Sequence, residues 1–244
     1  MLSLRNVSKS YRKGEVKAVD DLTLEVPPGE IFGFLGPNGA GKTTTIKMVV
    51  GLLRPDTGTI TVDGVDVARD PVKAKRRIGY CPDYPDLYEK LTGLEYLNFI
   101  GDVFGVPTET RRRIVGELLE MFSLQDALTD LIQTYSHGMK QKLAVIAAVM
   151  PDPALLILDE PMTGLDPKSS ALFKDLMRRR CDAGKAVFFS THILDVAERV
   201  CDRVGIINRG RLVAQGTMEE LRAMARGQDT LERIFLELTE ESEG

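Results

Sequence analysis

The periodicity of apolar residues changes twice along this chain. The N-terminal part contains β-like runs at 2–7 and 19–26, and the second run alternates between apolar and polar residues, as a strand does when one face of its sheet is solvated. Residues 31–35 are apolar on both faces, which is typical of a buried parallel strand. Residues 58–67 carry an Asp-Gly pair between two short runs, which predicts a hairpin.

Helical periodicity dominates from about residue 84 to residue 150. The run at 93–105 is apolar on most faces, so we expect a buried helix there. After residue 150, apolar runs at 154–158 and 186–190 alternate with helical patterns, as in a parallel sheet. The sequence therefore predicts an α/β protein with a parallel sheet, an N-terminal antiparallel β subdomain and an inserted α-helical subdomain. Residues 221–244 predict a C-terminal helix and an acidic tail.

The composition is that of an ordinary soluble globular protein, with 43% apolar and 28% charged residues. A net charge of −4 and a pI near 5.4 argue against nucleic acid as a partner. The apolar run at 143–150 is too short to span a bilayer, and the chain shows no signal-peptide pattern, so we expect no direct membrane insertion. Three cysteines without pairing or metal-ligand spacing predict reduced thiols.

A glycine-rich stretch, GPNGAGKTT, follows the apolar run 31–35 and opens a helical pattern. It matches G-x-x-x-x-G-K-[ST], in which glycines let backbone N–H groups turn toward an anion while the helix N-terminus adds further donors. Lys42 is expected to reach the β- and γ-phosphates of a nucleotide, and the Thr43 hydroxyl to bind Mg²⁺. A turn without a ligand is the alternative. The predicted contacts are Gly36, Pro37, Asn38, Gly39, Ala40, Gly41, Lys42, Thr43 and Thr44.

Two acidic residues and a histidine follow the later apolar runs. Asp159 and Glu160 come directly after 154–158, at the carboxyl end where open α/β sheets place their ligands. We expect Asp159 to hold Mg²⁺, and Glu160 to orient or deprotonate the water that attacks the γ-phosphate. His192 follows 186–190 and is predicted to contact the same phosphate or water. A strand cap and a structural histidine are the alternative interpretations.

The order of these motifs resembles that of one family, the ATP-binding-cassette (ABC) ATPases, which are the nucleotide-binding subunits of ABC transporters. The motifs are an aromatic residue at Tyr11, the P-loop at 36–44, a Q-loop region at 78–83, a signature at 135–139, Walker B at 155–160, a D-loop at 163–166 and a switch histidine at His192. The resemblance implies an ABC ATPase domain over residues 1–220, with a P-loop NTPase core, a helical subdomain at about 84–150, and ATP and Mg²⁺ as ligands.

The resemblance also implies a partner cassette. Two ABC ATPase subunits, identical or different, would form a head-to-tail pair in which each ATP lies between one P-loop and the other subunit's signature. Ser136 and Gly138 would approach the γ-phosphate held by the other subunit, and Asp166 would face that subunit. Tyr11 matches the aromatic residue that stacks on adenine, and a tyrosine at a sheet edge is the alternative.

A second implied partner is an integral membrane permease. The helical insertion resembles the region that receives such a protein, with Tyr84, Leu87 and Tyr88 as contacts, although an aromatic cluster there also fits an ordinary core. The chain would then be cytoplasmic and held at the inner face of the cell membrane through the permease.

Two motifs depart from the family pattern. Asp83 stands where the Q-loop has glutamine, and we expect it to contact Mg²⁺ or a water. The signature, usually L-S-G-G-Q, is Tyr-Ser-His-Gly-Met, so His137 replaces a glycine. Its side chain is expected to point away from the phosphate, and a metal or acid–base role is the alternative. The acidic Q-loop, the YSxGMKQ pattern and the closing LERIFLEL resemble the subgroup that works with export permeases.

Four functions compete for these motifs. The leading hypothesis is an ATPase subunit that powers export of an unknown substrate through a separate permease. A soluble ABC mechanoenzyme acting on ribosomes or DNA fits less well, because the chain holds one cassette and is acidic. A regulatory cassette that only dimerises with ATP fits poorly with the retained catalytic residues. A simple P-loop kinase lacks an acceptor site.

Overall fold

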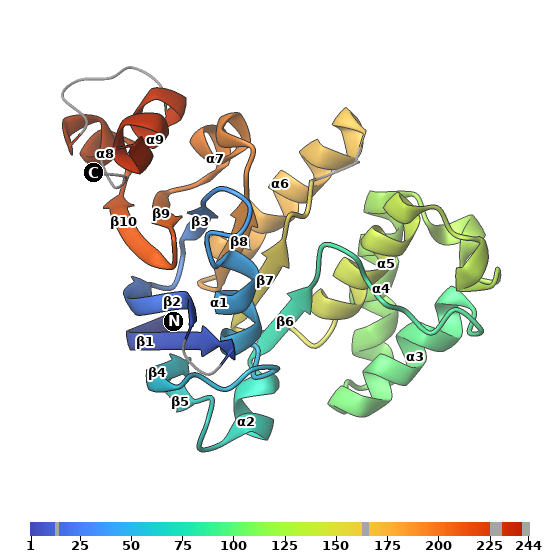
Figure 1. Ribbon diagram of the computed structural model, residues 1–244. Coiled ribbons are helices and arrows are strands. Elements are labelled where there is room, and N and C mark those ends of the chain that lie inside the picture. The colour runs from blue at the N-terminus through green and yellow to red at the C-terminus, as the bar shows by residue number, and fades with distance from the viewer. Residues whose placement is uncertain (13–14, 163–165, 225–230, 241–244) are drawn as a thin grey trace.

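The computed structural model describes all residues except 13–14, 163–165, 225–230 and 241–244 (Figure 1). Its strands form two sheets, with the orders β2-β1-β4-β5 and β10-β9-β3-β8-β7-β6. The strands are β1 (Leu2–Tyr11), β2 (Val16–Val26), β3 (Ile31–Leu35), β4 (Thr57–Val62), β5 (Val65–Asp66), β6 (Ile78–Cys81), β7 (Leu155–Asp159), β8 (Ala186–Thr191), β9 (Arg203–Asn208) and β10 (Arg211–Gly216).

The N-terminal strands form the smaller sheet, which is antiparallel as the sequence predicts. Strand β1 lies between β2 and β4, so that Leu2 pairs with Val26 on one side and Val62 on the other. Alternate side chains of these strands are buried, because only one face of the sheet packs against the rest of the molecule. The predicted hairpin is present: Asp63 and Gly64, with φ of 48° and 76°, connect β4 to β5.

The larger sheet is mixed rather than fully parallel. Strands β6, β7, β8, β3 and β9 run parallel, and β10 returns antiparallel to β9 as a hairpin. Every residue of β3, β7 and β8 is buried, which explains why these strands are apolar up to the polar residues at the carboxyl ends of β7 and β8. Since these three strands are parallel, their carboxyl ends lie at one edge of the sheet, and this edge carries the P-loop, Asp159 and His192.

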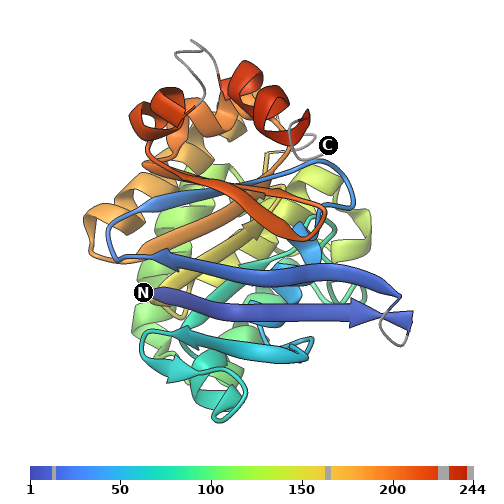
Figure 2. The same ribbon diagram turned by 60° about the vertical axis from the view of Figure 1, so that its left-hand side comes forward.

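Helices cover both faces of this sheet. They are α1 (Lys42–Val49), α2 (Pro71–Lys75), α3 (Gly93–Phe104), α4 (Thr108–Phe122), α5 (His137–Val149), α6 (Pro167–Asp182), α7 (Leu194–Val200), α8 (Met218–Met224) and α9 (Leu231–Glu240), with 3₁₀ turns η2 (Gln125–Ala127) and η3 (Ile132–Thr134). Figure 1 shows α3–α5 grouped beyond β6, away from the N-terminal sheet, and in Figure 2 the green helices lie behind the strands. One core cluster joins α5 to β7 through Leu143, Ile146 and Leu158, so the inserted helices are fixed to the sheet.

The prediction that 93–105 is buried is wrong for part of its surface. Thr92 and Glu95 form a capping box that starts α3, and Leu97 packs in the core. Phe99 and Val103, however, are exposed. Among the described helices, none is long and apolar enough to cross a membrane.

Candidate functional site

Glycines shape the loop between β3 and α1 because neighbouring backbone leaves no room for a side chain. A Cβ at Gly36 would lie 2.4 Å from the carbonyl oxygen of Ile207, and a Cβ at Gly41 would lie 2.4 Å from that of Ala18. Gly41 also has φ of 110°, a conformation that only glycine adopts without strain, and it caps the N-terminus of α1. The loop therefore wraps closely around a helix N-terminus, the arrangement that binds phosphate.

Lys42 points into the loop that precedes it. Its Nζ donates hydrogen bonds to the carbonyl oxygens of Gly36, at 2.6 Å, and Pro37, at 3.3 Å, and lies 4.0 Å from Glu160 Oε1. The side chain is 8% exposed, and this burial lowers the pKa of the ammonium group, an effect opposed by the carboxylates of Glu160 and Asp159. A buried cation thus lies inside the anion-binding loop.

Asp159 lies at the end of β7, next to two hydroxyl groups. The Ser190 hydroxyl, on the neighbouring strand β8, donates a hydrogen bond to Asp159 Oδ1. Burial raises the pKa of Asp159, which this bond, the charge of Lys42 and the nearby Thr43 hydroxyl oppose. Ser190 was missed in the sequence, where its only signal is its place at the end of an apolar run.

Glu160 and His192 form a direct pair. The distance from His192 Nδ1 to Glu160 Oε2 is 3.0 Å, and the His192 backbone N–H donates to the same oxygen at 3.4 Å. Glu160 has φ of 48°, an uncommon conformation for a non-glycine residue, and its N–H donates to the Ser190 carbonyl oxygen at 3.2 Å. The strand ends therefore hold the Glu160 carboxylate in one orientation.

A cleft of about 620 Å³ opens over these groups. Asp83 lines it from the loop after β6, and its pKa is raised by burial and by the nearby carboxylates of Asp159 and Glu160. The remaining lining residues are Ala18, Pro37, Asn38, Gly39, Gly41, Lys42, Thr43, Thr44, Lys47, Tyr80, Pro82 and Tyr84. The structure thus brings the P-loop, the Q-loop acid and the Walker B acids to one cavity.

Seven predicted site residues lie outside this lining, namely Tyr11, Gly36, Ala40, Ser136, Gly138, Asp166 and His192. Gly36 and Ala40 belong to the P-loop itself, and His192 contacts Glu160. Tyr11 is partly exposed at the end of β1. Ser136 is exposed and caps α5 by accepting a bond from the Met139 N–H, with Gly138 in the first turn. Asp166 caps α6 by accepting bonds from the Ser169 N–H and hydroxyl groups. The other predicted D-loop residues, 163–165, lie outside the described residues.

The donor set fits Mg²⁺ only together with a phosphate ligand. Mg²⁺ is usually held by one or two carboxylates, with waters and phosphate oxygens completing its octahedron. Asp159 and Thr43 line the same cleft beside the anion-binding loop, which suits such a shared site. In the part of the chain that the structure describes, no group of three His, Cys, Asp or Glu side chains could hold a metal alone.

Comparison with known proteins identifies the class to which this site belongs. Residues 19–163 match the family described as "ABC transporter", and the chain belongs to that family. It is an ATP-binding subunit, an ATPase whose hydrolysis serves transport. The predicted family, fold class and enzymatic activity are thereby confirmed.

Its relatives include transporter subunits named for export or resistance. The chain is 45% identical to the daunorubicin/doxorubicin resistance ATP-binding protein DrrA of Streptomyces peucetius over 207 residues, which are 85% of this chain but only 63% of DrrA. It is 38% identical to the Nod factor export ATP-binding protein I of Cupriavidus metallidurans (95% of this chain, 76% of that protein). It is 36% identical to the ABC transporter ATP-binding protein NatA of Bacillus subtilis, covering 97% of both chains.

Solved structures support the same family. One, described as the ATP-binding subunit of an ABC transporter, matches with a TM-score of 0.94 and 35% identity over 98% of this chain and 99% of its own. Another is a dimeric ATP-binding cassette in a post-hydrolysis state, bound to ADP and phosphate. It matches with a TM-score of 0.79 and 26% identity over 89% of this chain and 99% of its own. The export-type family resemblance inferred from the motifs agrees with these relatives.

Proposed function

We propose that this chain hydrolyses ATP to power the export of a substrate through a separate membrane permease. The observation that carries the proposal is the Glu160–His192 pair, held 4.0 Å from the Lys42 ammonium group at the mouth of a phosphate-binding loop. A cation, an oriented carboxylate and a helix N-terminus in one cleft are the groups that in-line hydrolysis of a phosphoanhydride requires.

In this mechanism Lys42 and the loop N–H groups bind the β- and γ-phosphates of ATP. The ammonium group exchanges its bonds to the Gly36 and Pro37 carbonyl oxygens for bonds to phosphate oxygens. Thr43, Asp159 and Asp83 would hold Mg²⁺, which supplies charge that stabilises the transferring phosphoryl group. Ser190 orients the Asp159 carboxylate through its hydroxyl group.

Glu160 accepts the proton of the attacking water, and His192 keeps the carboxylate in position. The imidazole and the His192 N–H both contact Oε2, whereas Oε1 faces Lys42, so the two oxygens are held by different partners. Because the carboxylate is already held in one orientation, little of the activation free energy arises from orienting the base.

A second cassette would complete the site. Ser136 and Gly138 lie at the exposed N-terminus of α5, where helix donors are free to bind a phosphate held by another subunit. Asp166 begins α6 and would face that subunit, and Tyr11 would stack on the adenine of the chain's own ATP. A solved relative with this fold is a dimer, which supports the proposal.

An apolar groove supports the permease partner. It has a volume of about 350 Å³ and lies where the sheet meets the inserted helices, with Tyr96, Ile100 and Phe104 of α3 on one side. Leu87 is buried and lines this groove, whereas Tyr84 and Tyr88 are exposed, at 76% and 59%, on the loop beside it. A cytoplasmic permease helix with apolar side chains would fit there, holding the chain at the inner face of the cell membrane.

Co-purification from native membranes tests this function. The chain with an affinity tag should retain an integral membrane protein, and Ile100→Asp, which places a charge in the groove, should lose it while ATP binding is unchanged. Arg112→Asp, on the exposed surface of α4, is the matched charge control. Recovery of ribosomes or DNA in place of a membrane protein would favour the mechanoenzyme alternative.

A further inference from the structure

Strand β2, the β9–β10 turn and the P-loop meet behind the nucleotide cleft. The Gly210 N–H, in the turn, donates to the carbonyl oxygen of Ala40 in the P-loop, at 2.8 Å. The Gly210 carbonyl oxygen accepts from the Asp20 N–H in β2, also at 2.8 Å. The turn is therefore a backbone bridge between the phosphate-binding loop and the N-terminal sheet.

The three segments approach one another closely around Ala18. A Cβ on Gly210 would lie 2.9 Å from the Ala18 carbonyl oxygen, and a Cβ on Gly41 would lie 2.4 Å from the same atom. Ala18 itself lines the nucleotide cleft. A shift of β2 relative to the turn would therefore change both the cleft wall and the support of the P-loop.

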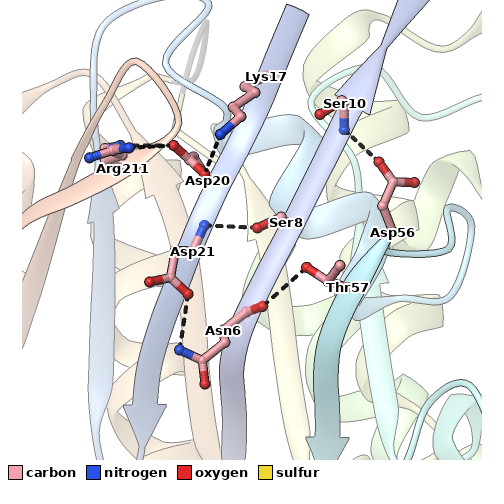
Figure 3. Close-up of polar contacts among 9 residues, drawn as sticks. All are labelled: Asn6, Ser8, Ser10, Lys17, Asp20, Asp21, Asp56, Thr57 and Arg211. Carbon is pink, nitrogen blue, oxygen red and sulfur yellow. Dashed lines mark hydrogen bonds and ion pairs between the residues drawn. The ribbon is translucent and has the colours of Figure 1, made fainter. Parts of the chain in front are cut away.

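An ion pair holds this junction from the outside (Figure 3). The Arg211 guanidinium group donates to Asp20 Oδ2 through Nε, at 2.9 Å, and through Nη2, at 2.6 Å, while Lys17 Nζ lies 3.2 Å from Asp20 Oδ1. The hydrogen bonds from Arg211 and then Lys17 lower the pKa of Asp20. The carboxylate is thus ionised and joined to β10 across the boundary between the two sheets.

The end of β2 that carries Lys17 and Asp20 also pairs with the end of β1 that carries Tyr11. Val16 pairs with Tyr11, and Lys17 pairs with Ser10, so backbone pairing links the strand that carries Asp20 to the end of β1. We infer that Asp20 and Arg211 are positioning residues that fix the β1–β2 end of the cleft relative to the P-loop, and so align the base end of ATP with its phosphates. This inference rests on the proposed contact of Tyr11 with adenine.

Calorimetric titration with MgATP and with magnesium tripolyphosphate tests the inference, because tripolyphosphate has no base. Asp20→Asn and Arg211→Met should each raise the dissociation constant for MgATP about two- to five-fold, as expected for a partly exposed ion pair. The dissociation constant for tripolyphosphate should not change, and Arg211→Lys, which keeps the charge, should retain most of the ATP affinity.

A matched control comes from the same sheet. Asp63 forms an ion pair with Arg77 at the β4–β5 turn, and Asn tolerates the positive φ of this position. Asp63→Asn should therefore change neither the dissociation constant for MgATP nor that for tripolyphosphate. Melting temperatures of all variants would identify any variant that fails to fold. Unchanged ATP affinity in both Asp20→Asn and Arg211→Met, or an equal loss for tripolyphosphate, would overturn the inference.

Tyr11→Ala separates this inference from the proposed function on which it rests. If Tyr11→Ala leaves ATP affinity unchanged, the base contact itself is wrong. If Tyr11→Ala weakens ATP binding while Asp20→Asn and Arg211→Met do not, the base contact stands and the positioning role is wrong.

Discussion

The nucleotide cleft and the signature segment (Tyr135–Met139) differ in where their polar groups find partners. In the cleft, Lys42 and Asp159 are almost completely buried and are hydrogen-bonded within the same chain, Lys42 to Gly36 and Asp159 to Ser190. In the signature, Ser136 and His137 are exposed, and Ser136 bonds within the start of its own helix. The cleft is organised by its own chain, whereas the signature presents a helix N-terminus to the outside.

This difference has an energetic consequence. The cleft brings the buried Lys42 ammonium group together with three carboxylates, and burial shifts the pKa of Lys42 down and those of Asp159 and Asp83 up. Each shift disfavours the charged form, so keeping these groups charged in the cleft costs free energy. Substitutions in the cleft should therefore act in the isolated chain, while those in the signature should act only when two cassettes pair.

The largest expected effect is that of Glu160→Gln. An amide cannot accept the proton of the attacking water, so ATP hydrolysis should fall about 10²–10⁴-fold, the usual contribution of a positioned base. ATP should still bind, because the loop and Lys42 are unchanged, and it should then accumulate a dimer. Steady-state ATPase rates and size-exclusion chromatography with ATP measure both effects. Turnover close to that of the wild type would remove Glu160 from its role.

Ser136→Arg is the corresponding test on the signature. A long cation at this helix start blocks the N-terminal donors, so hydrolysis should fall about 100-fold or more. ATP binding to the isolated chain should not change, which distinguishes this region from the cleft. The control is His137→Gly at the neighbouring position, which should retain ATPase activity within about two-fold, since a glycine keeps the helix donors. Loss of ATP binding by the isolated Ser136→Arg variant would contradict this difference between the signature and the cleft.

Lys42→Ala should weaken ATP binding about 100-fold, because it removes a buried charged donor from the phosphates. Isothermal titration of the isolated chain with MgATP measures the change. Unlike Ser136→Arg, this variant should show its full defect without a second cassette. An unchanged affinity would mean that Lys42 does not contact the bound nucleotide.

The smallest effect should be a gain in stability. Since burial raises the pKa of Asp159, its ionised form destabilises the fold above that pKa, and the penalty disappears as the pH falls through it. Asp159→Asn should therefore raise the melting temperature by about 2–4 °C at pH 7, corresponding to about 1 kcal/mol, and by less in acid. Scanning calorimetry at several pH values tests this sign. A lower melting temperature at pH 7 would show that the carboxylate stabilises the empty cleft.

The sequence predicts the cleft well because its main determinants are local. A buried strand has a continuous apolar run, and polar residues mark its carboxyl end, as Asp159 does in β7 and as Ser190, Thr191 and His192 do at the end of β8. The role of Ser190 could not be predicted in this way. It depends on β8 lying next to β7 with Asp159 opposite Ser190, which is a property of strand order rather than of any short segment.

The exposure of surface residues could not be predicted from the local sequence either. Phe99 and Val103 have the composition of a buried helix face, yet they are exposed because no described element packs over that side of α3. Likewise, nothing in the local sequence relates Asp20 to Arg211, which are 191 positions apart. Contacts between distant segments require the three-dimensional arrangement of both sheets.

The bonds of Lys42 to its own loop make the lysine an internal competitor of the nucleotide. Its ammonium group donates to the Gly36 and Pro37 carbonyl oxygens, so in the proposed mechanism ATP binding is a displacement reaction. The measured affinity is then the difference between two sets of bonds made by one side chain. A nucleotide with fewer phosphates should offer a weaker exchange.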